Sequence, residues 1–196
     1  MIMEGGKGKT QLTCYLCETT KNLLEYDEEN GICQKCYDEQ QKECAYYKSI
    51  KTNFYPEIEQ IEPGLYLGNE DAAINEDLLK ERNITAICAC GRGLLTPFLE
   101  KPGYEYLHLQ VNDFPKQNLI QYFPQQQAWM DQMRAQGRTI LIHCAAGISR
   151  SATFTIAYIM KREGMGFDSA LAYVRKGRKS VHPNSGFREQ LRAFEK

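Results

Sequence analysis

The sequence predicts an α/β protein in which helices flank a β-sheet, preceded by a small cysteine-rich module. Three observations support this class. Strand-like and helix-like patterns alternate from residue 57 to the C-terminus, as a sheet covered by helices requires. A β-branched strand, a loop of small residues and a helix follow one another around Cys144. Two C-x-x-C pairs lie near the N-terminus, in a segment too short to fill a hydrophobic core.

The elements of the sheet and its helices follow from the pattern of apolar residues. Short apolar or β-branched runs predict strands, and amphipathic runs predict helices. Pro124 is tolerated in a first helical turn, so a helix is expected from about there to Ala135. The predicted strands are Gly64–Leu67, Ile84–Ala89, Tyr104–Val111 and Thr139–Ile142. The other predicted helices are Asn69–Arg82, Ser151–Arg162, Phe167–Lys176 and Ser185–Phe194.

The composition limits the size and the class of the protein. A chain of 196 residues with 42% hydrophobic content can fill one ordinary domain and a small module. A formal net charge of −1 gives no sign of a basic nucleic-acid binder. The first residues, MIMEGGKGKTQL, lack the apolar core of a signal peptide, and no apolar stretch approaches the ~20 residues that cross a bilayer. We therefore expect a cytoplasmic protein, with the nucleus as a second location, and neither a membrane span nor a nucleic-acid partner.

Residues 141–151, LIHCAAGISRS, hold the strongest chemical signal in the chain. They place Cys144 at the end of a buried strand and Arg150 at the start of a helix. The residues between them are mostly small, so consecutive backbone N–H groups can converge on one anion. The helix N-terminus, these amides and the nearby cation all favour the thiolate, which is the nucleophilic form of cysteine. The pattern predicts a phosphate-binding loop with a nucleophile at its floor.

The side chains of Arg150 and Ser151 suit two further roles. The planar guanidinium of Arg150 can bind two phosphoryl oxygens and follow them into the transition state. Ser151 can donate a hydrogen bond to the sulfur as it leaves. Against this, buried cysteines are usually inert core residues, and a loop of small residues could merely bind an anion. The strand–loop–helix context favours the catalytic interpretation, and the nucleotide-binding pattern G-x-x-x-x-G-K-[ST] is absent at this site.

The loop resembles the signature of the cysteine-dependent protein phosphatases, and its form H-C-x-A-G-x-S-R-S resembles that of their dual-specificity branch. The matching residues are His143, Cys144, Ala146, Gly147, Ser149, Arg150 and Ser151. Similar segments follow the family's order at Gly64–Asn69, Ile84–Ala89, Val111–Phe123 and Pro183–Phe194, so the resemblance covers about residues 57–196. It implies a mixed, mainly parallel sheet flanked by helices, the cysteine phosphatase fold. It also implies that the substrate phosphate is bound by His143, Ala145, Ala146, Gly147, Ile148, Ser149 and Arg150.

The nucleophile needs an acid, because the departing oxygen of a phosphate ester leaves poorly unless it is protonated. The candidate is Asp113, whose segment DFPKQNLIQYF resembles the general-acid loop of the family. In that role the carboxyl group donates a proton while a phosphocysteine forms and later accepts one from water. The alternative is that Asp113 only caps a turn before Pro115. His143 is expected to order the loop rather than to act as a base.

The expected function is hydrolysis of phosphotyrosine, and of phosphoserine and phosphothreonine, in phosphorylated protein substrates. No metal is expected at the reacting phosphate, because the loop amides and Arg150 stabilise its charge. Relatives with a similar loop also act on phosphoinositides, RNA 5′ ends and phosphorylated glucans, which stay as alternatives. Ala145, Ala146 and Ile148 give the rim of the pocket no basic residue, which favours protein substrates. A scaffold that binds phosphorylated ligands with little turnover is a further alternative.

Four cysteines near the N-terminus predict a metal site. They form two C-x-x-C pairs separated by fifteen residues, a spacing typical of four-cysteine zinc sites: Cys14, Cys17, Cys33 and Cys36. We expect one structural zinc ion in a zinc ribbon or treble-clef-like module, since metal binding would supply folding energy that so small a segment lacks. Iron stays an alternative. The expected organisation is a zinc module at residues 10–45, which could also bind a partner protein, a linker at 46–56 and a catalytic domain at 57–196.

Two smaller features carry weaker hypotheses. The basic run Arg175, Lys176, Arg178 and Lys179 could steer phosphorylated substrates, or equally could be a solvated helix end. Cys90 occupies a position that resembles a second cysteine with which some relatives trap the oxidised nucleophile as a disulfide. Chance placement of Cys88 and Cys90 in the core is the simpler alternative.

Overall fold

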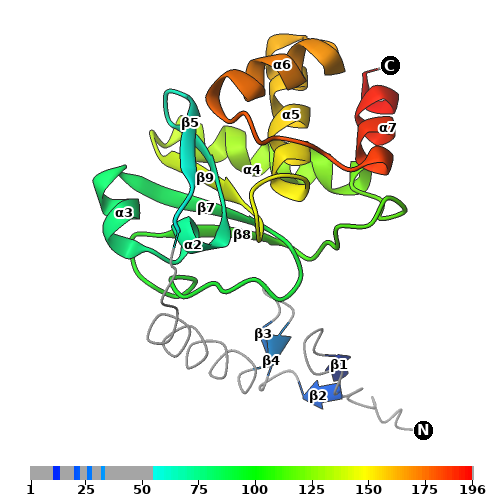
Figure 1. Cartoon of the computed structure of the whole chain (residues 1–196). Helices are drawn as coiled ribbons and strands as arrows, with labels where there is room; N and C mark the ends of the chain where they lie inside the picture. The colour runs from blue at the N-terminus through cyan, green and yellow to red at the C-terminus, as the bar shows by residue number, and fades with distance from the viewer. Residues whose placement is uncertain (1–10, 14–19, 23–25, 28–31, 34–54, 196) are drawn as a thin grey trace, which may run out of the picture. The chain divides into compact units, whose positions relative to one another are not determined.

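The computed structural model describes residues 11–13, 20–22, 26–27, 32–33 and 55–195 (Figure 1). The chain divides into two compact units, residues 1–50 and 51–196. In the first unit, β1 (Gln11–Thr13) pairs antiparallel with β2 (Thr20–Asn22). In the same way, β3 (Tyr26–Asp27) pairs antiparallel with β4 (Ile32–Cys33).

The second unit is built on a five-stranded sheet with the order β5-β6-β9-β7-β8. Its strands are β5 (Ile58–Glu62), β6 (Leu65–Gly68), β7 (Ile84–Cys90), β8 (Glu105–Leu109) and β9 (Thr139–His143). Only the edge pair β5 and β6 is antiparallel, and the other three pairings are parallel. The prediction of a mixed, mainly parallel sheet is confirmed. The sequence pattern missed β5, whose run IEQIE carries polar residues because the strand lies at the sheet edge.

Six helices and a short 3₁₀ turn accompany the described sheet. They are α2 (Glu70–Ala73), α3 (Glu76–Glu81), η2 (Ile120–Tyr122), α4 (Phe123–Ala135), α5 (Arg150–Glu163), α6 (Phe167–Gly177) and α7 (Ser185–Phe194). The single helix predicted over 69–82 is wrong, because Asn75 interrupts it. The Asn69 carboxamide oxygen accepts from the Ala72 N–H at 3.0 Å, and that of Asn75 accepts from the Leu78 N–H at 3.2 Å. Each asparagine therefore begins a short helix of its own.

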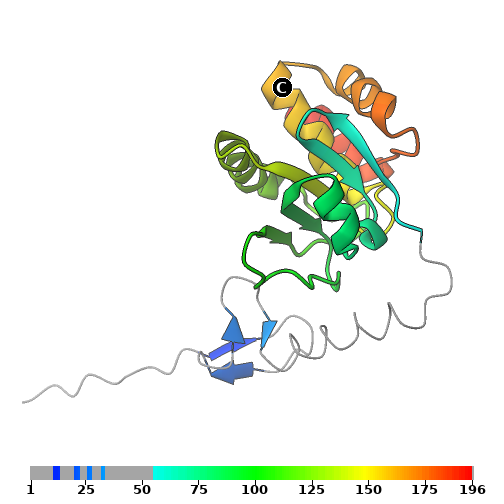
Figure 2. The same cartoon turned by 90° about the vertical axis from the view of Figure 1, so that its left-hand side faces the viewer.

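The sheet separates two hydrophobic cores, one on each face. Alternate residues of β9 point to opposite sides, so Ile140 and Ile142 join one core and Leu141 joins the other. The larger core packs α4, α5, α6 and α7 against the sheet, and the smaller one contains Ala73 of α2 and Leu79 of α3. Figure 2 shows this layered arrangement from the side. No helix among residues 55–195 is long and apolar enough to cross a membrane.

The parallel strands bring several loops to one edge of the sheet. Because β6, β7, β8 and β9 run in the same direction, the segments that follow them begin at the same carboxyl edge. The chain leaves these strands at Gly68, Cys90, Leu109 and His143 respectively. The residues just beyond these points, although distant in sequence, therefore share one neighbourhood.

Candidate active site

Cys144 follows the last residue of β9 and is 2% exposed. Its sulfur accepts two hydrogen bonds. The Gly147 N–H donates to Sγ at 3.2 Å, and the Ser151 hydroxyl donates at 3.1 Å. Two donors aimed at one sulfur stabilise negative charge on it, which is the condition that a thiolate nucleophile needs. Ser151 lies in the first turn of α5, as the predicted strand–loop–helix arrangement requires.

The loop between β9 and α5 is held in its curved shape by Gly147. This residue has a φ of 66°, a conformation that glycine adopts without strain. A Cβ at this position would also lie 2.4 Å from the Gly68 carbonyl oxygen at the end of β6. Any side chain would push the loop away from β6, so the glycine is required by both the backbone and the packing.

Arg150 is the first residue of α5, and its side chain is largely buried. Its Nε makes no hydrogen bond among the described residues and lies 3.9 Å from Oδ2 of Asp113. Gly91, which follows β7, leaves space for the guanidinium, since a Cβ there would lie 2.3 Å from Nη1. A buried guanidinium nitrogen without a protein acceptor is suited to an anion such as a phosphoryl group.

Asp113 lies on the segment after β8, with its carboxylate partly exposed beside Arg150. The Ser149 hydroxyl and the Asn184 carboxamide nitrogen each donate to its Oδ1 at 2.8 Å. Both donors come from distant parts of the chain, so Asp113 is tied to the phosphate loop and not only to its own turn. The Ser149 hydroxyl thus contacts the Asp113 carboxylate, and the role of Ser149 in binding the substrate stays a prediction.

Asn184 is a site residue that the sequence reasoning missed. It lies just before α7, where its side-chain oxygen accepts from the Phe187 N–H at 3.0 Å as a helix N-cap. Its side-chain nitrogen is thereby turned toward Asp113. The signal for it was the segment PNSGF, in which an asparagine precedes a helix, but nothing local indicates the contact with Asp113.

His143 is completely buried in the last position of β9, directly before Cys144. Burial lowers the pKa of His143 to about 3, so the ring is neutral near pH 7. A buried neutral ring cannot contact the substrate directly, which limits His143 to supporting the loop. The exposed residues of the loop are Ala145, Ala146 and Ile148.

The basic run at the end of α6 is not a uniform surface patch. Arg178 is buried and bonds to backbone carbonyls of the phosphate loop, so the idea that it steers substrates is wrong. Arg175 donates from Nε to the Val181 carbonyl oxygen at 2.9 Å. Lys176 and Lys179 are exposed. Among the described contacts, these two lysines are the members of the run that form no hydrogen bond or ion pair.

Cys88 and Cys90 lie in β7 and are buried as free thiols. Their sulfurs are 3.7 Å apart. Burial raises the pKa of the Cys90 thiol. Ala89 pairs with His143 in the sheet, which puts Cys90 beside the strand end that leads to Cys144. The disulfide suggested for an oxidised state of Cys144 stays a hypothesis.

A concavity of about 500 Å³ opens at the other end of α5. Among the described residues that line it there is neither a cysteine nor an arginine, and Glu195 supplies the one carboxylate. The lining residues are Met160, Lys161, Gly164, Met165, Gly166, Phe194 and Glu195. The groups suited to phosphoryl transfer are therefore gathered at the carboxyl edge of the sheet and not in this concavity.

The predicted metal ligands fall outside the part of the chain that the structure describes in atomic detail. Cys14, Cys17 and Cys36 lie outside the described residues, and only the backbone of Cys33 is described, in β4. Among the described side chains, no group of three or more His, Cys, Asp or Glu residues could hold a metal ion. The zinc site stays a prediction.

Comparison with known proteins gives a consistent result for the second unit. A family model described as "Dual specificity phosphatase, catalytic domain" matches residues 65–196. The mouse dual specificity protein phosphatase 22 is 41% identical over 139 residues, which cover 71% of this chain and 74% of the relative. The Arabidopsis thaliana dual specificity protein phosphatase 1B is 37% identical over 140 residues, which cover 71% of this chain and 83% of the relative.

Solved structures match the same part of the chain. The human tyrosine phosphatase-like serine/threonine/tyrosine-interacting protein superposes with a TM-score of 0.66 at 37% identity, covering 70% of this chain and 95% of that chain. A mouse protein assigned to the dual specificity phosphatases, complexed with zinc tungstate, gives a TM-score of 0.67 at 32% identity, covering 72% of this chain and 87% of that chain. The fold and the family thus agree.

Proposed function

This chain belongs to the dual-specificity phosphatase family, and we propose that Cys144 is its nucleophile, Arg150 its phosphate ligand and Asp113 its general acid and base. The family membership gives the chain dual-specificity protein phosphatase activity through a catalytic cysteine. The observation that carries the residue assignment is the pair of hydrogen bonds on the Cys144 sulfur, in a loop that ends at Arg150, whose Nε lies 3.9 Å from Oδ2 of Asp113.

The reaction proceeds in two displacements. In the first, the Cys144 thiolate attacks phosphorus, an S–P bond forms, and the ester O–P bond breaks as Asp113 gives its proton to the leaving oxygen. In the second, a water molecule loses a proton to Asp113 and attacks phosphorus. The S–P bond then breaks and inorganic phosphate leaves. The Ser151 hydroxyl, 3.1 Å from the sulfur, stabilises the thiolate that is released.

Arg150 and the loop amides stabilise the charge on the transferred group. The guanidinium of Arg150 presents a planar pair of donors to two phosphoryl oxygens. The Gly147 N–H already points toward the floor of the loop, where it reaches Cys144. Fixed donors of this kind need no rearrangement as the transition state forms.

The substrates of this mechanism are phosphotyrosine and phosphoserine or phosphothreonine residues in proteins. The exposed loop residues Ala145, Ala146 and Ile148 carry no charge, which suits a peptide better than a phosphoinositide, an RNA 5′ end or a glucan. The human serine/threonine/tyrosine-interacting protein is named as phosphatase-like and as an interacting protein. This name supports the scaffold alternative, in which the site binds phosphorylated ligands with little turnover. Turnover by the purified chain separates these two functions.

The test is turnover of a panel of phosphotyrosine, phosphoserine and phosphothreonine peptides, together with a phosphoinositide. We expect Cys144→Ser to abolish turnover of every substrate, because the hydroxyl is a far weaker nucleophile than the thiolate. Asp113→Ala should slow turnover by about 10²–10⁴-fold for substrates with poor leaving groups. Cys88→Ala serves as a matched control at a buried cysteine outside the loop. Equal activity of wild type and Cys144→Ser would refute the assignment, and binding without turnover by the wild type would favour the scaffold.

We propose also that Cys14, Cys17, Cys33 and Cys36 hold one structural zinc ion. Two antiparallel strand pairs accompany the cysteine pairs: the first C-x-x-C falls between β1 and β2, and the second begins at the end of β4. Four thiolates would give the ion a closed tetrahedral shell that stabilises the small unit. This module is also our candidate surface for a partner protein. Metal analysis should find about one zinc ion per chain, and Cys17→Ser should lower that ratio without reducing turnover of a small aryl phosphate.

A further inference from the structure

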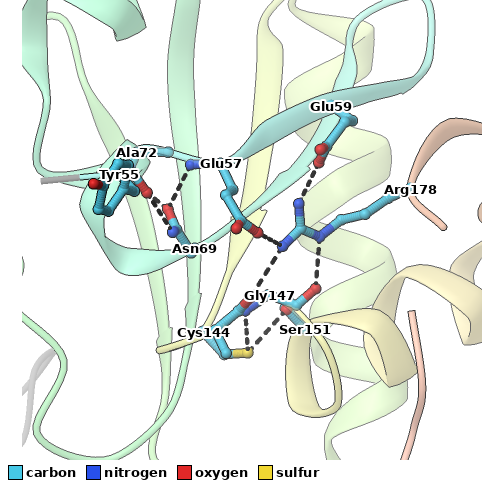
Figure 3. A network of polar contacts seen from close by, with 10 residues as sticks. Tyr55, Glu57, Glu59, Asn69, Ala72, Cys144, Gly147, Ser151 and Arg178 are labelled. Atoms are coloured by element: carbon cyan, nitrogen blue, oxygen red, sulfur yellow. Dashed lines mark hydrogen bonds and ion pairs between the residues drawn. The ribbon is translucent and has the colours of Figure 1, made fainter. Parts of the chain in front are cut away.

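We propose that Arg178 is a positioning residue that orients the amides of the phosphate loop, and that Glu57 and Glu59 hold it in place. The inference rests on the proposed function of that loop. Arg178 directly follows α6 as its C-cap, and its side chain is 1% exposed although it carries a permanent charge. Its guanidinium is turned toward the loop (Figure 3).

Arg178 bonds two consecutive carbonyls of the phosphate loop. Its Nε donates to the Gly147 carbonyl oxygen at 2.9 Å, and its Nη2 donates to that of Ala146 at 3.0 Å. In a trans peptide the C=O and the following N–H point in opposite directions. Anchoring the Ala146 carbonyl therefore turns the Gly147 N–H the other way, and this N–H indeed donates to the Cys144 sulfur at 3.2 Å.

The same geometry applies to the next peptide. With the Gly147 carbonyl held by Arg178, the Ile148 N–H is turned away from Arg178 and toward the side on which Gly147 faces Cys144. Arg178 thus orients two successive amides, those of Gly147 and Ile148, which would stabilise a bound oxyanion. Arg178 reaches the reacting centre only through these peptides and does not contact the substrate.

Glu57 and Glu59 hold the opposite side of the guanidinium. Nη2 donates to Oε2 of Glu57 at 2.7 Å, and Nη1 forms a hydrogen-bonded ion pair with Glu59 (Figure 3). A buried guanidinium without carboxylate partners would be strongly unfavourable, so these two residues allow the charge to be buried. The planar guanidinium donates to four acceptors in fixed directions. The single ammonium group of a lysine cannot donate in the same four directions.

The carboxylates are themselves tied to the sheet. The Glu57 N–H donates to Oδ1 of Asn69 at 3.0 Å, and the Asn69 N–H donates to the Glu57 carbonyl oxygen at 2.9 Å. Asn69 follows Gly68, whose carbonyl lies against Gly147. The contacts therefore form a closed circuit. Arg178 bonds Gly147, Gly147 packs against Gly68, the neighbouring Asn69 bonds Glu57, and Glu57 bonds Arg178. The start of the catalytic unit is coupled to the phosphate loop by this circuit.

The experiment measures oxyanion affinity in the full chain, with orthovanadate as the probe and a nitrophenyl phosphate as the substrate. The variants are Arg178→Met, Arg178→Lys and the double variant Glu57→Gln with Glu59→Gln. We expect Arg178→Met to raise the inhibition constant of vanadate by about tenfold or more, because the loss of one oriented donor in such sites costs that much or more. KM should rise with it, and Arg178→Lys should not restore either value.

Arg162→Met is the matched control. Arg162 is a partly buried arginine, paired with Glu62 at the far end of α5, and it has no bond to the loop among the described contacts. We expect this control to lower the melting temperature while vanadate affinity stays within about twofold of wild type. The opposite outcome is that Arg178→Met and Arg162→Met lose the same amount of melting temperature and both keep their vanadate affinity. That outcome would show that Arg178 only stabilises the fold.

If Arg178→Met does not fold, the double glutamine variant decides, because Glu57 and Glu59 are 56% and 41% exposed and tolerate substitution better. Weakened vanadate binding in this variant supports the proposal, and unchanged binding overturns it. A wild-type chain that neither binds vanadate nor hydrolyses any phosphate ester would overturn the proposed function itself. A wild type that does both, with unaffected variants, would overturn only the role of Arg178.

Discussion

Asn184→Ser separates the two tasks of one side chain, the capping of α7 and the holding of Asp113. Serine is as good an N-cap as asparagine, so its hydroxyl can still accept from the Phe187 N–H. Serine is too short to replace the carboxamide nitrogen that donates to Asp113 at 2.8 Å. The variant should keep the stability of the protein while it loosens Asp113, the proposed general acid.

The size of the effect follows from the contacts of Asp113. A hydrogen bond to a charged group is worth about 1.5–3 kcal/mol, which corresponds to about 10–150-fold in rate if the bond matters fully in the transition state. Ser149 continues to donate to the same oxygen at 2.8 Å, so part of the positioning remains. We therefore expect the lower end, about a tenfold loss of kcat/KM for a poor leaving group.

The assay compares phenyl phosphate with a nitrophenyl phosphate, whose leaving group needs little help from an acid. Asn184→Ser should slow the first substrate about tenfold and the second far less. Asn75→Ser is the matched control, since Asn75 caps α3 in the same way with no tie to Asp113. Equal losses for both substrates, or none for either, would refute the role of Asn184 in holding the acid.

Two further predictions concern Gly91 and His143. Gly91→Ala should weaken vanadate inhibition by about tenfold or more, because the added Cβ would lie 2.3 Å from Nη1 of Arg150 and displace its fork; an unchanged inhibition constant would contradict this packing. Burial lowers the pKa of His143 to about 3 from 6.5, so the unfolded chain binds a proton there below about pH 6.5 that the native chain does not. The free energy of unfolding should therefore fall as the pH drops below about 6.5, with up to ~1.4 kcal/mol per pH unit contributed by His143. Urea unfolding measured at pH 7 and at pH 5 should show a smaller fall for His143→Gln than for the wild type.

The chemistry of the site could be predicted because its central part is local. Cys144, Arg150 and Ser151 lie within one strand–loop–helix unit, where spacing alone fixes which groups face one another. The alternation of strands and helices predicted the sheet for a similar reason, since each element has its own period of apolar residues. Asp113 needed the resemblance to a family, because its loop lies far from Cys144 in sequence.

The errors of the sequence analysis have physical causes as well. The helix expected over 69–82 splits because Asn75 offers an N-cap, which competes with continuing the helix. The strand β5 was missed because an edge strand buries little and carries no apolar alternation. Arg178 was placed on the surface because a basic residue near a helix end is usually solvated there.

By itself, the sequence determined the class of fold, the loop that we propose holds the nucleophile, and the reaction that a cysteine, an arginine and a loop of amides can perform. Only the tertiary structure decided how that loop is held. The Asn184 bond to Asp113 joins residues 71 positions apart, and the Arg178 bond to Glu57 joins residues 121 positions apart. Contacts of this range arise from the order of strands in the sheet, which brings the carboxyl ends of β6, β7, β8 and β9 together. No local pattern of residue types specifies these contacts. The orientation of Cys144 and Arg150 toward a phosphate depends on them.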